Sequence, residues 1–195
     1  YARANADVLQ GKVRVEPLGR EVVPGVWSDG EPLIDPSAEL VGPIFLGSGV
    51  KIGPEARIIG PTVLRDYVVV EPGAVIDRSI VWRNTYVGER SEIHGSIVGR
   101  QCALKARVVL EEGSVVADHS IVGEGARIRA QVKIWPDKQV ESGAVVHTSL
   151  IWGAQGRRTL FGRFGVPGLV NVDLPPELAA GLGAASASTL APGAT

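Results

Sequence analysis

Three histidines and one cysteine are the residues of this chain that could carry out catalysis themselves. An imidazole at His94, His119 or His147 could act as a general base or bind zinc. A thiolate at Cys102 could act as a nucleophile. Whether any of them does so depends on the elements that position them, and the sequence describes those elements clearly.

An aliphatic residue recurs at every sixth position along most of the chain, with two five-residue steps. The series is Ile34, Leu40, Leu46, Ile52, Ile58, Leu64, Val70, Ile76, Val81, Val87, Ile93, Val98, Leu104, Leu110, Val116, Val122, Ile128, Ile134, Val140 and Val146. The next residue is often glycine or acidic, and a small or branched residue often stands four positions after the aliphatic one. This spacing is neither a helical period nor a simple strand alternation.

The six-residue period predicts an all-β fold, a parallel β-helix of hexapeptide repeats over residues 34–153. Each unit forms a short strand and a bend, three units close a triangular coil, and coils stack about 4.8 Å apart. The aliphatic residue points inward, and we expect the following glycine at a corner where the backbone is tight. The series predicts six to seven coils. Prolines such as Pro43 and Pro61 exclude an α-solenoid.

This register separates the candidate catalytic residues. His94 and His147 fall on the same face and corner three coils apart, about 14 Å, and His119 falls on another face. Zinc bonds are about 2 Å long, so we expect solvated corner histidines and no metal site within one chain. A histidine base at a subunit interface is the alternative. Cys102 takes the small interior position, which predicts a packed, inert thiol.

Two tryptophans and three arginines are further candidates for binding. Trp82 and Trp135 follow the inward residue on the same face, three coils apart, and are expected to point outward. They would contact another domain or subunit, or pack on the flanking segments. Arg157, Arg158 and Arg163 could bind phosphate, although a solvated linker is the simpler interpretation.

Composition excludes several classes of protein. The net charge of −1 provides no field to attract nucleic acid or an acidic membrane, and no apolar run reaches membrane-spanning length. A single cysteine excludes an internal disulfide framework and indicates a cytoplasmic protein. Because the chain contains no Met and starts at Tyr1, we expect it to be part of a longer protein.

The two ends of the chain depart from the period. Residues 1–33 predict the end of a helix, with Gly11 as its C-cap, followed by short strands that lead into the first coil. Residues 154–195 predict a linker and a short helix, with Asp173 as its N-cap and Pro176 in its first turn. We expect the C-terminal segment to cover one end of the β-helix.

The chain resembles a known family in two stretches. Residues 133–153, KIWPDKQVESGAVVHTSLIWG, resemble the final coils of bacterial sugar nucleotidyltransferases of the GDP-mannose pyrophosphorylase type. Residues 1–12, YARANADVLQGK, resemble the last helix of their catalytic domain. The left-handed sense of the coils is adopted from a separate likeness, since proteins with this hexapeptide pattern resemble the left-handed parallel β-helix family. The nucleotidyltransferase resemblance implies an NTP and a hexose 1-phosphate as substrates, with Mg²⁺ assisting.

In that family the phosphate-binding loop and metal-binding acids lie in an N-terminal Rossmann-like domain. This chain has no such loop, because GSGVKIG at residues 47–53 keeps the six-residue period. We therefore assign no catalytic, cofactor-binding or metal-binding residue here, and the fragment itself is expected to be non-catalytic.

A second resemblance concerns residues 162–185, GRFGVPGLVNVDLPPELAAGLGAA, which are similar to the opening of α-phosphohexomutases. The matching residues are Phe164, Gly165, Gly168, Asn171, Asp173, Pro176 and Glu177. Val166 and Pro167 replace the Thr-Ser pair of that family, and its arginine is missing. The departures argue against mutase activity in a segment that otherwise matches the start of such a domain.

The leading hypothesis is an assembly module that holds a nucleotidyltransferase domain and forms a homo-oligomer, a trimer or dimer, through its flat faces. The partners would be the flanking catalytic domains of the same chain, with no nucleic acid and no membrane. The alternative is a hexapeptide-repeat acyltransferase using acyl-CoA, which should have a long loop near an active histidine. The deviations from the period are deletions. A regulatory nucleotide or sugar site is a third possibility.

Overall fold

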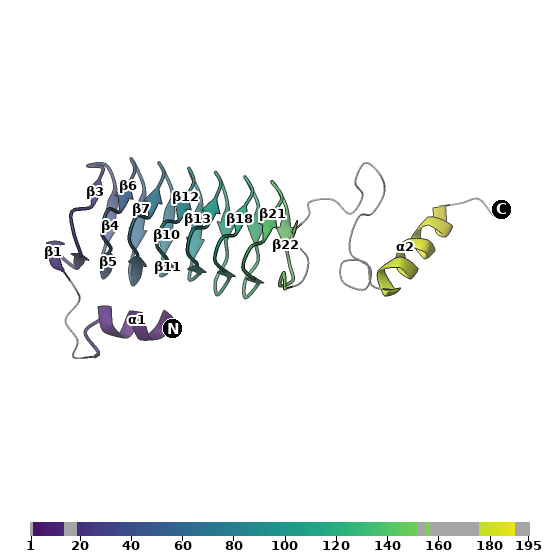
Figure 1. The fold of residues 1–195 in the computed structure, drawn as a ribbon, viewed down its shortest axis with the longest axis horizontal. Helices are drawn as coiled ribbons and strands as arrows, with labels where there is room; N and C mark the ends of the chain where they lie inside the picture. Colours follow the sequence, from purple (N-terminus) through teal and green to yellow (C-terminus); the bar gives the residue numbers. More distant parts are fainter. Residues whose placement is uncertain (1, 14–18, 152–154, 157–175, 190–195) are drawn as a thin grey trace. The chain divides into compact units, whose positions relative to one another are not determined.

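The computed structural model describes residues 2–13, 19–151, 155–156 and 176–189. The described residues from 26 to 151 form a β-solenoid of about seven turns, with parallel pairing between the coils (Figure 1). The expected all-β hexapeptide-type fold is confirmed. The chain divides into two compact units, residues 1–158 and 159–195, and each is described by itself.

Three sheets form the sides of the solenoid, and the chain visits sheets B, C and A in turn in each coil. Sheet A contains β1 (Arg20–Val23), β2 (Val26–Ser28), β5 (Ile44–Leu46), β8 (Thr62–Leu64), β11 (Ile80–Val81), β14 (Ile97–Val98), β17 (Val115–Val116) and β20 (Lys133–Ile134). Sheet B contains β3 (Leu33–Ile34), β6 (Lys51–Ile52), β9 (Val69–Val70), β12 (Tyr86–Val87), β15 (Ala103–Leu104), β18 (Ile121–Val122), β21 (Gln139–Val140) and β23 (Gln155–Gly156). Sheet C contains β4 (Glu39–Val41), β7 (Arg57–Ile59), β10 (Val75–Asp77), β13 (Glu92–His94), β16 (Val109–Leu110), β19 (Arg127–Ile128) and β22 (Val145–Val146).

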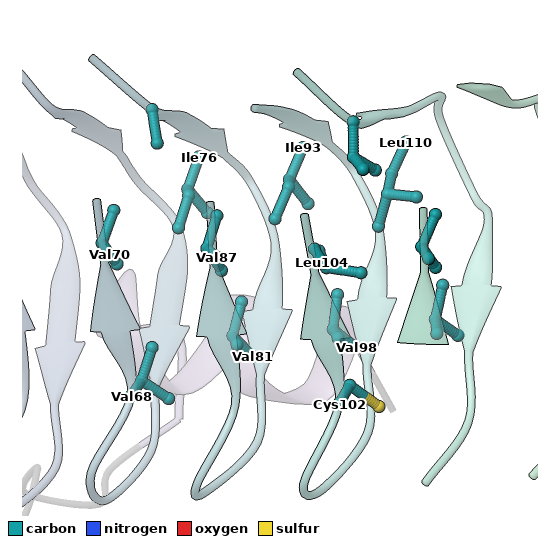
Figure 2. Packing of buried hydrophobic residues seen from close by; sticks show 14 of the residues in the cluster. Val68, Val70, Ile76, Val81, Val87, Ile93, Val98, Cys102, Leu104 and Leu110 are labelled. Atoms are coloured by element: carbon teal, nitrogen blue, oxygen red, sulfur yellow. The ribbon is translucent and has the colours of Figure 1, made fainter. Parts of the chain in front are cut away.

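The aliphatic residues of the repeat line the inside of the solenoid in stacked rows. Ile76 lies level with Ile93 in the parallel ladder, and Leu110 follows in the next coil. Figure 2 shows these rows on neighbouring sheets. Nearly all of these residues are buried in one continuous core. A single unit cannot bury its inner side alone, so each coil depends on its neighbours for stability.

Small hydroxyl side chains fill the narrow corners of the interior. Thr85 Oγ1 donates a hydrogen bond to the carbonyl of Gly99 at 2.7 Å, and Ser91 Oγ donates to the carbonyl of Lys105 at 2.9 Å. Both bonds link one coil to the next. Within the described residues, no buried side-chain nitrogen or oxygen lacks a hydrogen-bond partner. These hydrogen bonds therefore offset the cost of removing the polar groups from water.

The glycines that follow the inner residue have a different role from the one expected. A Cβ atom on Gly47 would stand 2.5 Å from the backbone nitrogen of Asp66 in the next coil, and Gly47 does not have a positive φ. The side chain of Asp66 accepts a hydrogen bond from the backbone nitrogen of Ser48 at 3.1 Å. Close approach between coils, and not tight backbone, therefore requires glycine here.

Short elements lie at either side of the regular coils. Helix α1 (Ala2–Leu9) is followed by Gly11 (φ 70°). The backbone nitrogen of Gly11 donates a hydrogen bond to the carbonyl of Val8, and that of Lys12 donates to the carbonyl of Asp7. This Schellman arrangement confirms Gly11 as the C-cap. Strand β1 pairs antiparallel with β2, and β2 pairs parallel with β5.

Helix α2 (Pro176–Thr189) belongs to the second unit and begins at the expected proline. The proposed N-cap Asp173 lies outside the described residues, as does most of the segment expected to cover an end of the solenoid. Neither described helix has the length and apolar character needed to cross a membrane.

Candidate functional site

The structure keeps the three histidines apart. His94 ends β13 and His147 follows β22, and these strands are three steps apart in sheet C, as the register predicts. His119 lies at the corner between sheets A and B. In the described part of the chain, no three His, Cys, Asp or Glu side chains are grouped so that they could hold a metal ion. No residue here is therefore assigned to zinc or to Mg²⁺.

Each of the two central histidines lies beside acidic or amide groups of its own or neighbouring coils. His94 Nδ1 is 3.8 Å from Asp77 Oδ2, and its Nε2 is 3.6 Å from Glu92 Oε2. His119 Nε2 forms a 2.8 Å hydrogen bond with Gln101, and Nδ1 lies 3.3 Å from Asp137. These contacts join neighbouring coils along the edges of the solenoid. Contacts within the solenoid are therefore sufficient to explain why His94 and His119 occur here, without a role in substrate binding.

Cys102 takes the place that a hydroxyl residue takes in the coils on either side. Thr85, Cys102 and Ser120 occupy equivalent corners, and each hydrogen-bonds to a carbonyl of the next coil; the Cys102 thiol lies 3.2 Å from the carbonyl of Ala117. The side chain is buried, and burial raises its pKa to about 11. A thiol with that pKa is a poor nucleophile at neutral pH, so its role is packing.

The two five-residue steps shorten the corner between sheets C and A, and a cluster of charges covers that corner. Arg78 contacts Asp77 at 3.1 Å and reaches Glu112 at 2.9 Å, two coils further along. The hydrogen bond that Arg78 donates to the Asp77 carboxylate is the largest cause of a raised pKa for Arg78. A Cβ atom on Gly95, in the coil between, would collide with the Glu112 carboxylate. The sequence period located the deletions but not this ion-pair bridge.

The outer face of sheet A carries an apolar patch that the sequence analysis did not identify. Phe45, Val63 and Ile80 point away from the core, yet each is at most 8% exposed. Leu9 of α1 packs against them, together with Trp27, Trp82 and Ile97. We call this set the sheet A patch. A search for aliphatic or aromatic residues one position before each inner aliphatic residue of this sheet would have found it.

The two tryptophans differ in environment. Trp82 is only partly exposed because it packs on the sheet A patch, and the guanidinium of Arg65 lies 6.0 Å from its ring centre and 5.9 Å from that of Phe45. Trp135 is 51% exposed. Trp135 is exposed, as expected of an outward-pointing corner residue, and Trp82 fits the second expectation, because the apolar cluster that it packs on also includes Leu9 of the N-terminal flanking segment. Arg157, Arg158 and Arg163 lie outside the described residues.

These features describe a solenoid whose three sheets share one core and differ in their outer surfaces. A family model described as the GMPPB C-terminal domain matches residues 40–151, more than half of the chain. The chain belongs to the GMPPB C-terminal domain family. No curated protein sequence matches it.

Solved structures share the coil architecture. A hexapeptide transferase family protein from Anaplasma phagocytophilum is 30% identical, with a TM-score of 0.54 over 62% of this chain and 76% of that chain. PerB from Caulobacter crescentus, solved with CoA and GDP-perosamine, is 25% identical over 64% and 50%, with a TM-score of 0.33. UDP-N-acetylglucosamine acyltransferase from Campylobacter jejuni is 17% identical over 60% and 68%, with a TM-score of 0.40. At such TM-scores the last two carry no inference about this chain.

Proposed function

We propose that this GMPPB-type β-helix is the positioning and assembly module of a sugar-1-phosphate nucleotidyltransferase of the mannose-1-phosphate guanylyltransferase type. The observation that carries the proposal is the packing of α1 on the sheet A patch. Residues 1–12 resemble the last helix of the catalytic domain in such enzymes, so this contact would tie that domain to the solenoid.

The contact joins α1 to the outer surface of sheet A through Leu9. Phe45, Val63 and Ile80 lose nearly all their exposure although they are outside the core, and burying an apolar side chain contributes about 1.5–3 kcal/mol. The Schellman end at Gly11 sets the direction in which the chain leaves α1. A rigid solenoid loses little entropy when another domain rests on it.

The proposed reaction joins an NTP to a hexose 1-phosphate. An oxygen of the sugar phosphate forms a bond to the α-phosphorus as the bond to pyrophosphate breaks, which gives an NDP-sugar and pyrophosphate. Phosphate-binding and Mg²⁺-binding groups would come from the domain that precedes α1, and the reaction would take place in the cytoplasm. The residues of this chain would fix that domain's position.

The test is an assay of the natural full-length protein for pyrophosphate release from GTP and mannose 1-phosphate, with other NTP and hexose 1-phosphate pairs in parallel. We expect release with at least one pair. We also expect Leu9→Asp to lower the thermal stability of the catalytic domain, while Val13→Asp, an exposed change near the same helix, should not. Absence of release with every pair would overturn the proposal.

The acyltransferase alternative has one observation in its favour, the 30% identity to a hexapeptide transferase family protein. Against it, the described coils show no inserted loop, and His94 and His119 contact protein side chains at the solenoid edges. Calorimetry with acetyl-CoA separates the two functions. We expect no saturable heat, and micromolar binding would favour the transferase.

The mutase-like segment forms the second part of the proposal. Pro176 and Glu177 begin α2, as expected for the proline and acid of that resemblance, and its other matching residues lie outside the described part of the chain. We propose that residues 154–195 connect the solenoid to a phosphohexomutase-like domain. An assay of hexose 1-phosphate to 6-phosphate conversion by the full-length protein tests whether that domain is active.

A further inference from the structure

The outer face of sheet B carries a column of apolar side chains at its centre. The column consists of the first residues of β9, β12, β15 and β18: Val69, Tyr86, Ala103 and Ile121. Tyr86 is 38% exposed and Ile121 is 42% exposed. The strands on either side, β6 and β21, begin with polar Lys51 and Gln139.

This column differs from the outer surfaces of the other two sheets. Sheet A is occupied by α1 at the sheet A patch. Sheet C alternates charged side chains at Arg57, Glu92 and Arg127 with the valines of the strands between them. In the described part of the chain, sheet B is therefore the uncovered face whose central strands present adjacent apolar residues with no charged residue between them, and such faces commonly mark an interface.

The column is arranged symmetrically about the middle of its sheet. Sheet B has eight strands, and its midpoint falls between β12 and β15. If a second copy faces the first with its strand order reversed about that point, Val69 lies opposite Ile121, and the large Tyr86 lies opposite the small Ala103. The same reversal places Lys51 opposite Gln139. A second copy of the sheet is thus complementary in size to the first, and Lys51 meets a neutral side chain.

We propose that sheet B is the interface of a symmetric dimer in which the two solenoids run antiparallel, related by a two-fold axis that lies between β12 and β15 and parallel to the strands. This inference rests on the assembly part of the proposed function and specifies its partner as a second copy of this chain. A two-fold interface uses the same patch on both subunits.

The other symmetric arrangement, with parallel solenoids, fits the observations less well. It would place Tyr86 on Tyr86 and Ala103 on Ala103, which leaves a collision beside a gap. It would also bring Lys51 against Lys51, and like charges facing each other across an interface are destabilising. In the antiparallel arrangement the corner residues Tyr67 and His119 meet.

The size of the face matches a modest dimer. Eight strands at about 4.8 Å spacing and a width near 16 Å give about 500–600 Å² per copy, or about 1,000–1,200 Å² in total. Specific interfaces begin near this value. Dimerisation should therefore depend on protein concentration, which sets the conditions for the experiment.

The first experiment uses single-cysteine variants and a short bismaleimide crosslinker on this chain at high protein concentration. Lys51→Cys and Gln139→Cys should crosslink when mixed and not when each is alone, because position 51 of one copy lies about 24 Å from position 51 of the other. The buried Cys102 adds no background. Crosslinking of Lys51→Cys with itself would overturn the antiparallel arrangement.

The second experiment measures mass by light scattering on a pair of variants with similar exposure. Ile121→Glu on sheet B should give a monomer, while Val145→Glu on sheet C, 46% exposed in the parent chain, should remain a dimer. A monomeric parent chain, a trimer, or loss of the dimer only in Val145→Glu would overturn the proposal. Each of these outcomes leaves the pyrophosphate assay untouched, so the two proposals fail separately.

Discussion

Sheets A and C share one inner pattern and have opposite outer surfaces. Both contribute rows of buried aliphatic residues, such as Leu64 and Ile58, to the same core. On the outside, sheet A has Phe45, Val63 and Ile80 beneath α1, whereas sheet C has Arg57 and Glu92 in solvent. The inner residues build the solenoid, and the outer residues decide what each side contacts.

The corners after sheets A and C also differ in the residue that directly follows the inner aliphatic residue. After sheet A this position holds Gly47 or Gly99, where a Cβ atom would collide with the next coil, while after sheet C it holds Asp77 or Glu111. The two corners are therefore packed differently. Four substitutions, ordered by expected effect, test these distinctions.

The largest effect is expected at an inner position of sheet C. Ile128→Asp places a carboxylate in a fully buried site, which should lower the free energy of unfolding by more than about 4 kcal/mol. Its exposed neighbour changed as Arg129→Ala should cost at most about 0.5 kcal/mol, the value of a surface ion pair. Urea unfolding measures both. Equal losses would show that the inner and outer assignment is wrong.

The next effect is expected at the corner after sheet A. Gly47→Ala forces a Cβ against the backbone of Asp66 and should cost about 2–3 kcal/mol. The comparison variant is Gly125→Ala, where no atom lies within 4 Å and only the positive φ of 65° is unfavourable. It should cost about 1 kcal/mol. A larger loss at Gly125 would favour backbone conformation over inter-coil spacing as the reason for glycine.

The outer surfaces are compared by removing one apolar side chain from each. Phe45→Ala should lower the free energy of unfolding by about 2 kcal/mol and speed hydrogen exchange in α1, because Phe45 belongs to the patch that α1 covers. Val109→Ala on the outside of sheet C should leave exchange in α1 unchanged. If both variants left α1 protected, the helix would be held by something other than this patch.

The smallest effect concerns the charges of sheet C. Glu111 accepts a hydrogen bond from Arg129 at 2.9 Å, and this contact, aided by Arg127, holds its pKa below the usual 4.5. A lowered folded-state pKa stabilises the protein above pH 4.5, and this stabilisation is lost as the pH falls through the folded value. Glu111→Gln should therefore flatten the decline of the melting temperature in acid. A pH profile identical to that of the parent chain would contradict this contribution.

Much of the fold could be predicted from the sequence because the inner residues recur at a nearly constant local spacing. Each unit contributes one aliphatic side chain to the core at a regular spacing, so the series from Ile34 to Val146 reveals the strands of the regular coils, the number of coils and the place of both deletions. The same register placed His94 and His147 three coils apart and Cys102 in the interior. The environment of Trp82 was left between two expectations, because the apolar cluster on sheet A also takes in Leu9 of α1, from a distant part of the chain.

The sequence by itself determined the solenoid, its register and its buried rows, since a six-residue period is written in consecutive residues and needs no partner to be recognised. Only the tertiary structure decided which outer face is covered and which side chain fills the space above Gly47 or Gly95. Those contacts join residues one coil apart, at separations of 17 to 19 residues. The sequence separation between a glycine and the residue above it changes at each five-residue step. Packing therefore determines that residue, and a fixed spacing does not.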